Sequence, residues 1–194
     1  SEATFKLVNC LFSNYGLIIL DPNSKTLKEI MIPFFKNELF DQCCNKHVSI
    51  QIDKLGKDYD INYKSQVNPR EINLFYLKKG ERKRIIKTKD GFKLSNSSKE
   101  FTFISMEKEL FKHPQRFSPN VLMRPLFQEI ILPNVSYIGG SAEISYWLEL
   151  KTFFEYHKTP FPILLVRDSC LLVSSQISKK LQNLNISFND LFKG

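Results

Sequence analysis

The sequence lacks the features that would mark a membrane, secreted or zinc-binding protein. No apolar run approaches the roughly 20 residues that a membrane-spanning helix needs. The N-terminal stretch SEATFKLVNCLF has neither the basic start nor the small-residue cleavage site of a signal peptide. The 4 cysteines form no CxxC pair and the 3 histidines are scattered, which gives no set of zinc ligands. We therefore expect a cytoplasmic protein with free thiols, no membrane partner and no metal.

Short catalytic signatures are missing as well. The sequence has no GxxxxGK[ST] phosphate-binding loop, no GxSxG nucleophile turn and no GxGxxG after a strand, and no nucleophile stands beside a base. Apolar side chains are nevertheless plentiful, since 42% of the 194 residues are hydrophobic and 17 are phenylalanine. This composition predicts one domain with a real core, with or without a smaller insertion.

The net charge of +8 raises the question of a polyanion partner. Much of the positive charge lies in residues 78–93 (KKGERKRIIKTKDGFK), around two turns rather than along a helix face or among aromatic side chains that stack on bases. A solvated hairpin explains this cluster, and an anionic ligand or polyanion is the alternative. We expect no nucleic acid partner.

Outside the middle of the chain, the hydrophobic pattern predicts helices and buried strands in alternation. Residues 3–14 have helical spacing, residues 17–20 (LIIL) predict a buried parallel strand, and Pro33 should kink or divide the helical segment 24–40. Further along, the predicted helices are 106–113, 124–132, 141–156, 177–184 and 188–192, and the predicted strands are 134–138, 162–166 and 169–173.

The middle of the chain has the period of two that is typical of strands. Candidate strands separated by the turn signals KKGE and KDG predict a small antiparallel meander, and they cover residues 61–67, 73–77, 83–88 and 92–95. The sequence thus predicts an α/β core in two parts, residues 1–60 and 105–194, with an inserted antiparallel β subdomain at residues 61–104. The core parts supply only three or four strands, fewer than the roughly five or six of a doubly wound sheet. We therefore expect a piece of something larger.

Residues 137–147 (YIGGSAEISYW) place two glycines between a predicted strand and a predicted helix, where open α/β sheets bind ligands. Gly139 and Gly140 would let backbone N–H groups approach an anion or carboxylate. Glu143 would either cap the helix or hold an amine or hydroxyl of a substrate. A tight turn is the structural alternative for the glycine pair. Tyr146 completes the candidate substrate-binding residues of this stretch.

A second candidate lies in residues 118–129 (SPNVLMRPLFQE). Arg124 and Gln128 share one face of a predicted helix, and a guanidinium at a helix start opposes the helix dipole. Arg124 therefore suits a carboxylate or phosphate ligand, with a structural ion pair as the alternative. Asn120 is also a candidate, although Ser-Pro-Asn is ordinary turn chemistry.

A third stretch, residues 66–77 (QVNPREINLFYL), supplies the secondary candidates. Asn68, Arg70 and Glu71 lie in the predicted bend between two strands. Asn-Pro favours a turn, and Arg70 beside Glu71 is equally explained as a surface pair.

These three stretches, together with PFPILLVRDS at residues 160–169, resemble the bacillithiol biosynthesis cysteine-adding enzyme family in their order and spacing. The resemblance covers nearly the whole chain. It implies part of a Rossmann-like core, related in shape to class I aminoacyl-tRNA synthetases, with the meander as part of a connecting insertion. It also implies that the chain is the middle portion of a much longer family chain, without its first strand and its C-terminal coiled coil.

The resemblance further implies a function. The family is a ligase that joins cysteine to glucosaminyl malate by an amide bond in the last step of bacillithiol biosynthesis, and this reaction type leads us to expect ATP or another nucleotide. The full-length family is expected to form a homodimer through a region outside this chain. The alternative is a basic α/β binding module for RNA or another polyanion without catalysis.

Overall fold

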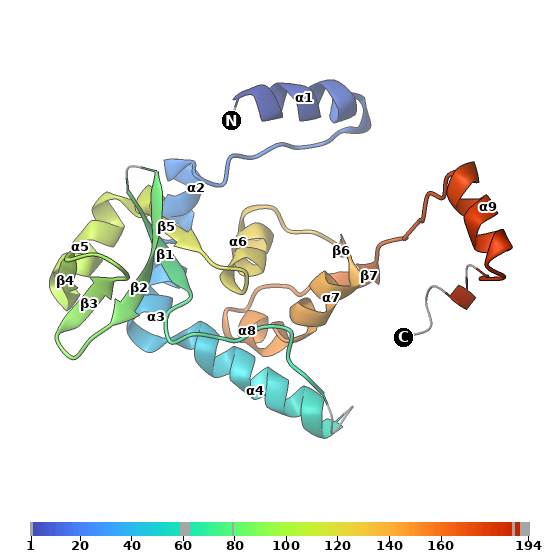
Figure 1. The fold of residues 1–194 in the computed structure, drawn as a ribbon. Coiled ribbons are helices and arrows are strands. Elements are labelled where there is room, and N and C mark those ends of the chain that lie inside the picture. Colours follow the sequence, from blue (N-terminus) through green and yellow to red (C-terminus); the bar gives the residue numbers. More distant parts are fainter. Residues whose placement is uncertain (1, 59–62, 79, 188, 191–194) are drawn as a thin grey trace.

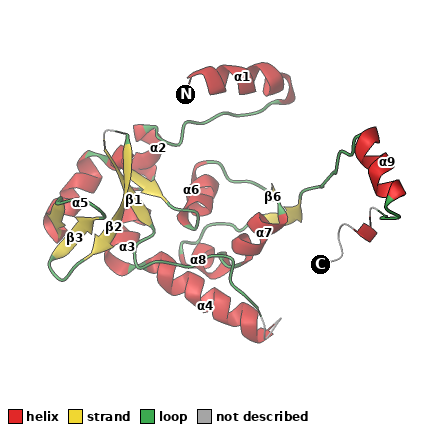
Figure 2. Ribbon diagram, in the orientation of Figure 1, coloured by secondary structure: helices red, strands yellow, loops and turns green. Residues whose placement is uncertain are grey.

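The computed structural model shows helices arranged around two separate sheets, one antiparallel and one parallel (Figures 1 and 2). The helices nearest the chain ends, α1 (Glu2–Phe12) and α9 (Ser175–Asn183), lie apart from the body and have no buried residue. They confirm the helices predicted over 3–14 and 177–184. The structure describes residues 2–58, 63–78, 80–187 and 189–190.

Three helices follow the first extended segment: α2 (Lys25–Ile30), α3 (Ile32–Asp41) and α4 (Cys43–Asp58). Pro33 lies in the first turn of α3 and divides the predicted helical segment in two, because a proline is tolerated where no helical N–H bond is needed. Gln42, with a left-handed φ of 52°, separates α3 from α4. The sequence pattern left residues 43–58 without an assigned element, although α4 buries residues at helical spacing.

The antiparallel sheet confirms three strands of the predicted meander, those over 73–77, 83–88 and 92–95, and contains two further strands that were not predicted. Its spatial order is β4-β3-β2-β1-β5. The strands are β1 (Leu74–Lys78), β2 (Glu81–Lys87), β3 (Gly91–Leu94), β4 (Glu100–Thr102) and β5 (Phe117–Pro119). A Cβ on Gly91 would lie 2.0 Å from the Phe101 carbonyl oxygen, so the KDG turn requires glycine for β3 and β4 to approach. β5 pairs with β1, although no strand was predicted over residues 117–119.

Helices α3 and α5 (Phe103–Lys112) pack against this sheet (Figure 1). Phe35, Tyr76, Phe92 and Met106 are at most 1% exposed in the core between them. The α5 helix agrees with the helix predicted over 106–113, and the Thr102 hydroxyl caps it by accepting from the Ser105 N–H at 3.1 Å.

The second half of the chain builds a strand–helix–strand unit. Its elements are α6 (Met123–Ile131), β6 (Ser136–Gly139), α7 (Ser141–Leu148), α8 (Lys151–Tyr156) and β7 (Ile163–Val166). β6 and β7 are parallel, with Ser136 opposite Ile163 and Gly139 opposite Val166. The one helix predicted over 141–156 is divided at Glu149, which is fully buried. Its carboxylate accepts hydrogen bonds from the 63–66 segment at this break.

Two predicted strands are wrong. Residues 17–20 and 169–173 form no ladder, and Ile18 and Leu172 are 61% and 92% exposed. A short apolar run becomes a strand only when a partner strand is available, and neither run has one among the described residues. Residues 63–67, from a third predicted strand, are irregular, while residues 61–62 lie outside the described part. The helix predicted over 188–192 also lies mostly outside it.

One apolar cluster contains residues from all three predicted regions, for example Phe35, Phe92 and Trp147. The fifth strand of the meander sheet also comes from residues 117–119, beyond the proposed insertion. The division of the chain at residues 60 and 104 stays a prediction.

Candidate functional site at the carboxyl ends of the parallel strands

The carboxyl ends of the two parallel strands bring together residues that are far apart in the sequence. β6 ends at Gly139 and α7 begins at Ser141, while Arg167 directly follows β7. The Arg167 N–H donates to the Gly139 carbonyl at 2.8 Å, which extends the parallel ladder. This is the edge at which open α/β sheets bind ligands.

The two glycines make room for neighbouring side chains. Neither has a positive φ, so no left-handed turn requires them. A Cβ on Gly139 would lie 2.8 Å from the ring of Tyr137, and a Cβ on Gly140 would lie 3.1 Å from a guanidinium nitrogen of Arg167. The glycine pair therefore allows a tyrosine and an arginine to close over the strand end.

Glu143 occupies the start of α7. One carboxylate oxygen accepts the Gly140 N–H at 2.9 Å, and the other accepts the Tyr137 hydroxyl at 3.3 Å. The bond from Gly140 is the main reason that the pKa of Glu143 is lowered, and the charge of Arg167 lowers it further. Glu143 thus stays ionised. The Gly140 N–H, which the sequence analysis predicted to approach an anion, already donates to Glu143.

Arg124 projects from the first turn of α6 and remains exposed. Its guanidinium donates to Gln128 Oε1 and to the Tyr146 hydroxyl, each at 3.2 Å. Partial burial would lower the pKa of Arg124, but hydrogen bonds to Tyr146 and Tyr137 raise it above its usual value. Among the described residues no carboxylate forms an ion pair with Arg124, so a structural ion pair does not explain its charge.

Arg167 also lies at this site, although the sequence analysis did not select it as a candidate site residue. Its side chain is exposed and lies over Gly140, within the electrostatic range of Glu143. A charged residue directly after a predicted buried strand, as in ILLVRDS, was the available signal, because side chains at that place point to the ligand edge.

An apolar hollow of about 310 Å³ adjoins this group, and Arg124 and Gln128 line its polar side. The remaining lining is apolar and comes from α2, α6 and the segment before α2, as in Leu20, Leu27 and Phe127. Apolar walls with a few polar groups are typical of small-molecule sites.

Comparison with known proteins assigns the family. The family model described as "Bacillithiol biosynthesis BshC, N-terminal Rossmann-like domain" matches residues 1–168. The chain belongs to the BshC family. It is 49% identical over 192 residues to a protein of Flavobacterium psychrophilum and to one of Flavobacterium johnsoniae, and 42% identical over 192 residues to one of Christiangramia forsetii. All three relatives bear the name "Putative cysteine ligase BshC".

These matches cover 99% of this chain but 35% of each relative. The resemblance to the family and the Rossmann-like fold class are confirmed. The chain belongs to the family's N-terminal domain, where the sequence analysis expected a middle portion. Because the chain spans about a third of its BshC relatives, the activity of the whole protein is a matter for proposal.

Asn120 has a structural place in this BshC chain. Its side-chain oxygen accepts the N–H groups of Leu122 and Met123 at 3.0 and 3.2 Å, and its side-chain nitrogen donates to Asn73 at 2.8 Å. Asn73 in turn donates to the buried carboxylate of Glu38. These bonds support the turn interpretation of Ser-Pro-Asn.

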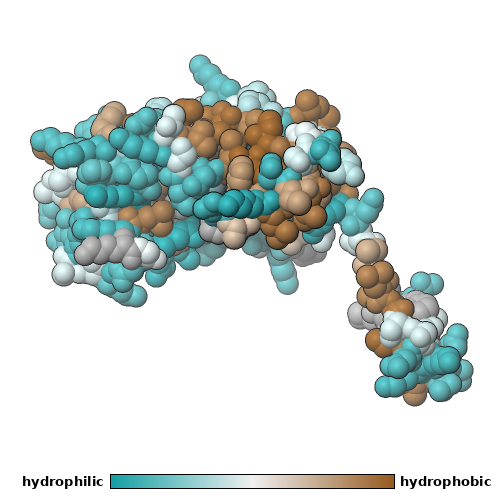
Figure 3. Space-filling view, turned by 90° about the horizontal axis from the view of Figure 1, so that it is seen from above, coloured by the Kyte–Doolittle hydropathy of each residue, from teal (hydrophilic) through white to brown (hydrophobic). Residues whose placement is uncertain are grey.

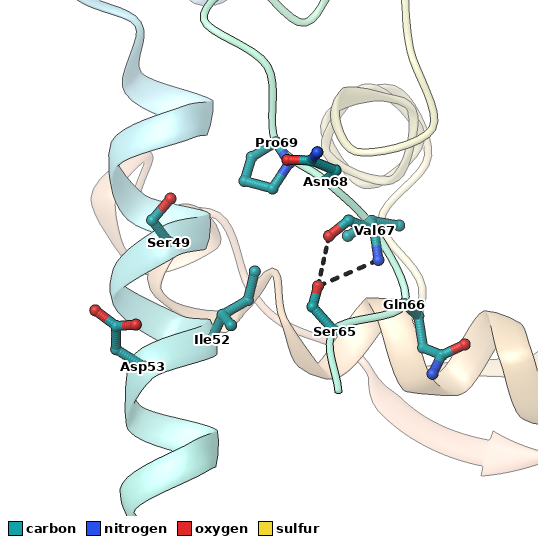
Figure 4. A pocket seen from close by; sticks show the side chains of 8 residues that line it. All are labelled: Ser49, Ile52, Asp53, Ser65, Gln66, Val67, Asn68 and Pro69. Carbon is teal, nitrogen blue, oxygen red and sulfur yellow. Dashed lines mark hydrogen bonds between the residues drawn. The ribbon is translucent and has the colours of Figure 1, made fainter. Parts of the chain in front are cut away.

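The secondary candidates lie elsewhere on this BshC domain. Asn68 lines a cavity of about 530 Å³ between α4 and the 65–69 segment (Figure 4). The backbone of Arg70 exchanges hydrogen bonds with the Asn73 side chain, and Glu71 is exposed. Among the described residues, no hydrogen bond or ion pair joins these three to the Arg124 group, which consists of Arg124, Gln128, Glu143, Tyr146 and Arg167.

Cys43 and His157 resemble a nucleophile and base in distance only. Cys43 Sγ lies 3.6 Å from His157 Nε2 and 3.5 Å from Glu38 Oε2. Burial raises the pKa of Cys43 and lowers that of His157 to about 4, so the thiol stays protonated and the imidazole neutral. In the described parts of this BshC chain, no cluster of three His, Cys, Asp or Glu residues could hold a metal, and no helix is long and apolar enough to cross a membrane.

Proposed function

We propose that this chain is part of a ligase that joins the carboxyl group of cysteine to the amine of glucosaminyl malate, the last step of bacillithiol biosynthesis. Its membership of the BshC family supports a ligase, and the relatives bear a cysteine ligase name. The observation that carries the proposal is the meeting of Arg167 and Glu143 at Gly140, with Arg124 beside them through Tyr146 and its charge acting on Glu143, at the ligand edge of β6 and β7.

The charges of this group match the chemistry of the proposed substrates. Cysteine and glucosaminyl malate both carry carboxylate and amine groups. Arg124 lacks a carboxylate partner among the described residues and Arg167 is exposed, so each is open to a substrate carboxylate through charge-assisted hydrogen bonds. The ionised Glu143 supplies an acceptor for an amine. We assign Arg124, Gln128, Gly139, Gly140, Glu143, Tyr146 and Arg167 to this substrate site.

Joining a free carboxylate to an amine releases water and is uphill in water, so the carboxyl group must be activated. ATP or another nucleotide is the co-reactant that this reaction type requires. The turn from β6 to α7 does not fit a phosphate group, because the Gly140 N–H is bound to Glu143 and that carboxylate would repel an anion. We therefore assign no part of the nucleotide chemistry to these residues.

We further propose that the full-length enzyme works in the cytoplasm as a homodimer, formed through a part of the family's chain outside these 194 residues. The family comparison lends no support to the alternative of an RNA-binding module without catalysis.

The proposal is tested on the full-length enzyme by mass spectrometry of the condensation product. We expect product and nucleotide consumption only when cysteine, glucosaminyl malate and a nucleotide are all present. Serine in place of cysteine is the matched control for the thiol amino acid. Condensation at full rate without any nucleotide, or none with each common nucleoside triphosphate, would contradict the proposal.

A further inference from the structure

The antiparallel sheet contains a polar hollow of about 270 Å³, away from the substrate site. Strand register explains its lining, because Tyr76 lies opposite Lys83 and Lys78 lies opposite Glu81, so all four side chains share one face of β1 and β2. Lys99 enters from the segment before β4. The middle of this face of the sheet packs into the apolar core. Lys78, Lys83 and Lys99 lie where the helices no longer cover the face.

Lys99 is held in place rather than free in solvent. Its ammonium donates to the Tyr76 hydroxyl at 3.1 Å and lies 4.7 and 4.5 Å from the ring centroids of Tyr76 and Phe101. The Tyr76 hydroxyl donates to Glu109 at 2.6 Å, and Glu109 forms its ion pair with Arg116, also at 2.6 Å. Glu109, whose charge acts on Lys99, is therefore already paired with another cation.

The hollow keeps an excess of positive charge. Lys83 pairs with Glu81 at 2.9 Å, but Glu81 is 66% exposed, so this pair is weak. Among the described residues, neither Lys78 nor Lys99 forms an ion pair. Burial, followed by the charge of Lys78, lowers the pKa of Lys99, and the charge of Glu109 offsets this only in part.

We propose that this hollow binds a small anion bearing two or more phosphate groups. Ammonium groups act as compact point charges that suit phosphate oxygens, and the hydroxyl of Ser97 offers a further donor. Single-stranded RNA is less suited, because it needs exposed aromatic faces and Tyr76 is 1% exposed beneath Lys99. The basic hairpin noted in the sequence thus acquires a local role, independent of the proposed substrate site.

The test is calorimetric titration of the 194-residue chain with pyrophosphate at about 0.1 M salt, where surface charge is partly screened. The variant Lys78→Gln/Lys83→Gln should weaken binding at least about tenfold, since it removes two charge-assisted contacts. The matched control, Lys89→Gln/Lys93→Gln, removes the same charge from the adjacent β2–β3 hairpin outside the hollow and should change binding less than about twofold. Lys99→Gln, with its melting temperature recorded, tests the third ammonium.

Three results would overturn the proposal. The first is no pyrophosphate binding at millimolar concentration, and the second is equal weakening by the hollow and control variants. The third is oligo(U) binding that the hollow variant abolishes and pyrophosphate does not displace, which would assign the hollow to RNA. Binding that survives the control variant and is lost in the hollow variant supports a phosphate site, whether or not the substrate site is active.

Discussion

At the residue scale, Arg124 is a charge that the structure leaves open to a ligand. The side chains to which it donates hydrogen bonds, among them Gln128 and Tyr146, are neutral. The sequence predicted its place at a helix start and its closeness to Gln128 from spacing alone. It could not predict the contact between Arg124 and Tyr146, because that contact joins α6 to α7 through the tertiary fold. Arg167 escaped prediction for the same reason, since its neighbourhood depends on the pairing of β6 with β7.

We expect Arg124→Lys in the full-length enzyme to lower kcat/KM at least about tenfold, because a single ammonium replaces a planar group worth roughly 1.5–3 kcal/mol in a charge-assisted contact. The melting temperature should barely move, since Arg124 is exposed. Arg84→Lys, on an exposed residue of β2, is the matched control. Lost stability with intact activity would make Arg124 structural.

Lys28 is a buried cation without a carboxylate partner among the described residues. It is 1% exposed, its ammonium donates to the Phe117 carbonyl, and it lies 5.6 and 5.5 Å from the ring centroids of Phe35 and Phe127. Burial, followed by the charge of Arg82, lowers the pKa of Lys28 from 10.5 to about 8. Folding therefore makes this ammonium easier to deprotonate.

This shift predicts a pH dependence of stability. Between pH 8 and 10.5 the unfolded chain holds the Lys28 proton more tightly than the folded chain, so the free energy of unfolding rises with pH in this window. In urea unfolding, the free energy of unfolding of the parent should rise relative to that of Lys28→Met by up to about 1.4 kcal/mol per pH unit in this window. Lys25→Met, on an exposed lysine of α2, retains Lys28 and is the matched control: its free energy of unfolding should rise with pH as that of the parent does. A difference between the parent and Lys28→Met that stays constant with pH would refute the assignment.

At the element scale, most helices and three meander strands followed from the sequence, whereas α4 and the strands predicted over 17–20, 61–67 and 169–173 did not match it. A helix forms its hydrogen bonds within itself, so local spacing and Pro33 were sufficient to predict α2 and α3. The meander strands have partners next to them in sequence, joined by short turns. Residues 17–20 and 169–173 have comparable apolar runs, but a parallel strand needs a distant partner that local pattern cannot reveal.

Local pattern also missed the break between α7 and α8, which depends on the irregular 63–66 segment. The buried Glu149 accepts the Tyr63 hydroxyl at 2.6 Å and the Ser65 hydroxyl and Gln66 N–H at 2.9 Å each. This carboxylate, rather than strand pairing, fixes the irregular 63–66 segment against the helices.

We expect Glu149→Gln to lower the free energy of unfolding by about 2–3 kcal/mol, since the amide NH₂ cannot accept these bonds. Hydrogen exchange at the Gln66 and Val67 amides should also accelerate. Glu155→Gln, on an exposed residue of α8, is the matched control. Unchanged exchange at Gln66 would show that other contacts hold the segment.

At the scale of the whole molecule, the chain exposes surface that a Rossmann-like sheet normally buries. Parallel strands are usually covered on both faces, yet Ile138, Ile163 and Val166 of β6 and β7 are 61%, 62% and 66% exposed. Figure 3 shows a broad hydrophobic area on one face of the body. The two parallel strands provide one ligand edge, whereas sites of this fold class are built from both halves of a sheet.

The last prediction is that the 194-residue chain, produced alone, folds but does not condense cysteine with glucosaminyl malate. The Arg124 group supplies one side of a pocket, so weak anion binding should survive while turnover is lost. The exposed strand edges and apolar faces should also make the chain associate as its concentration rises, visible by light scattering after size exclusion. Product formation is measured by mass spectrometry beside the full-length enzyme, with Arg124→Lys of the full-length enzyme as an intermediate reference. Comparable rates for the chain and the full-length enzyme would show that these 194 residues contain the complete site and that its other half is not needed.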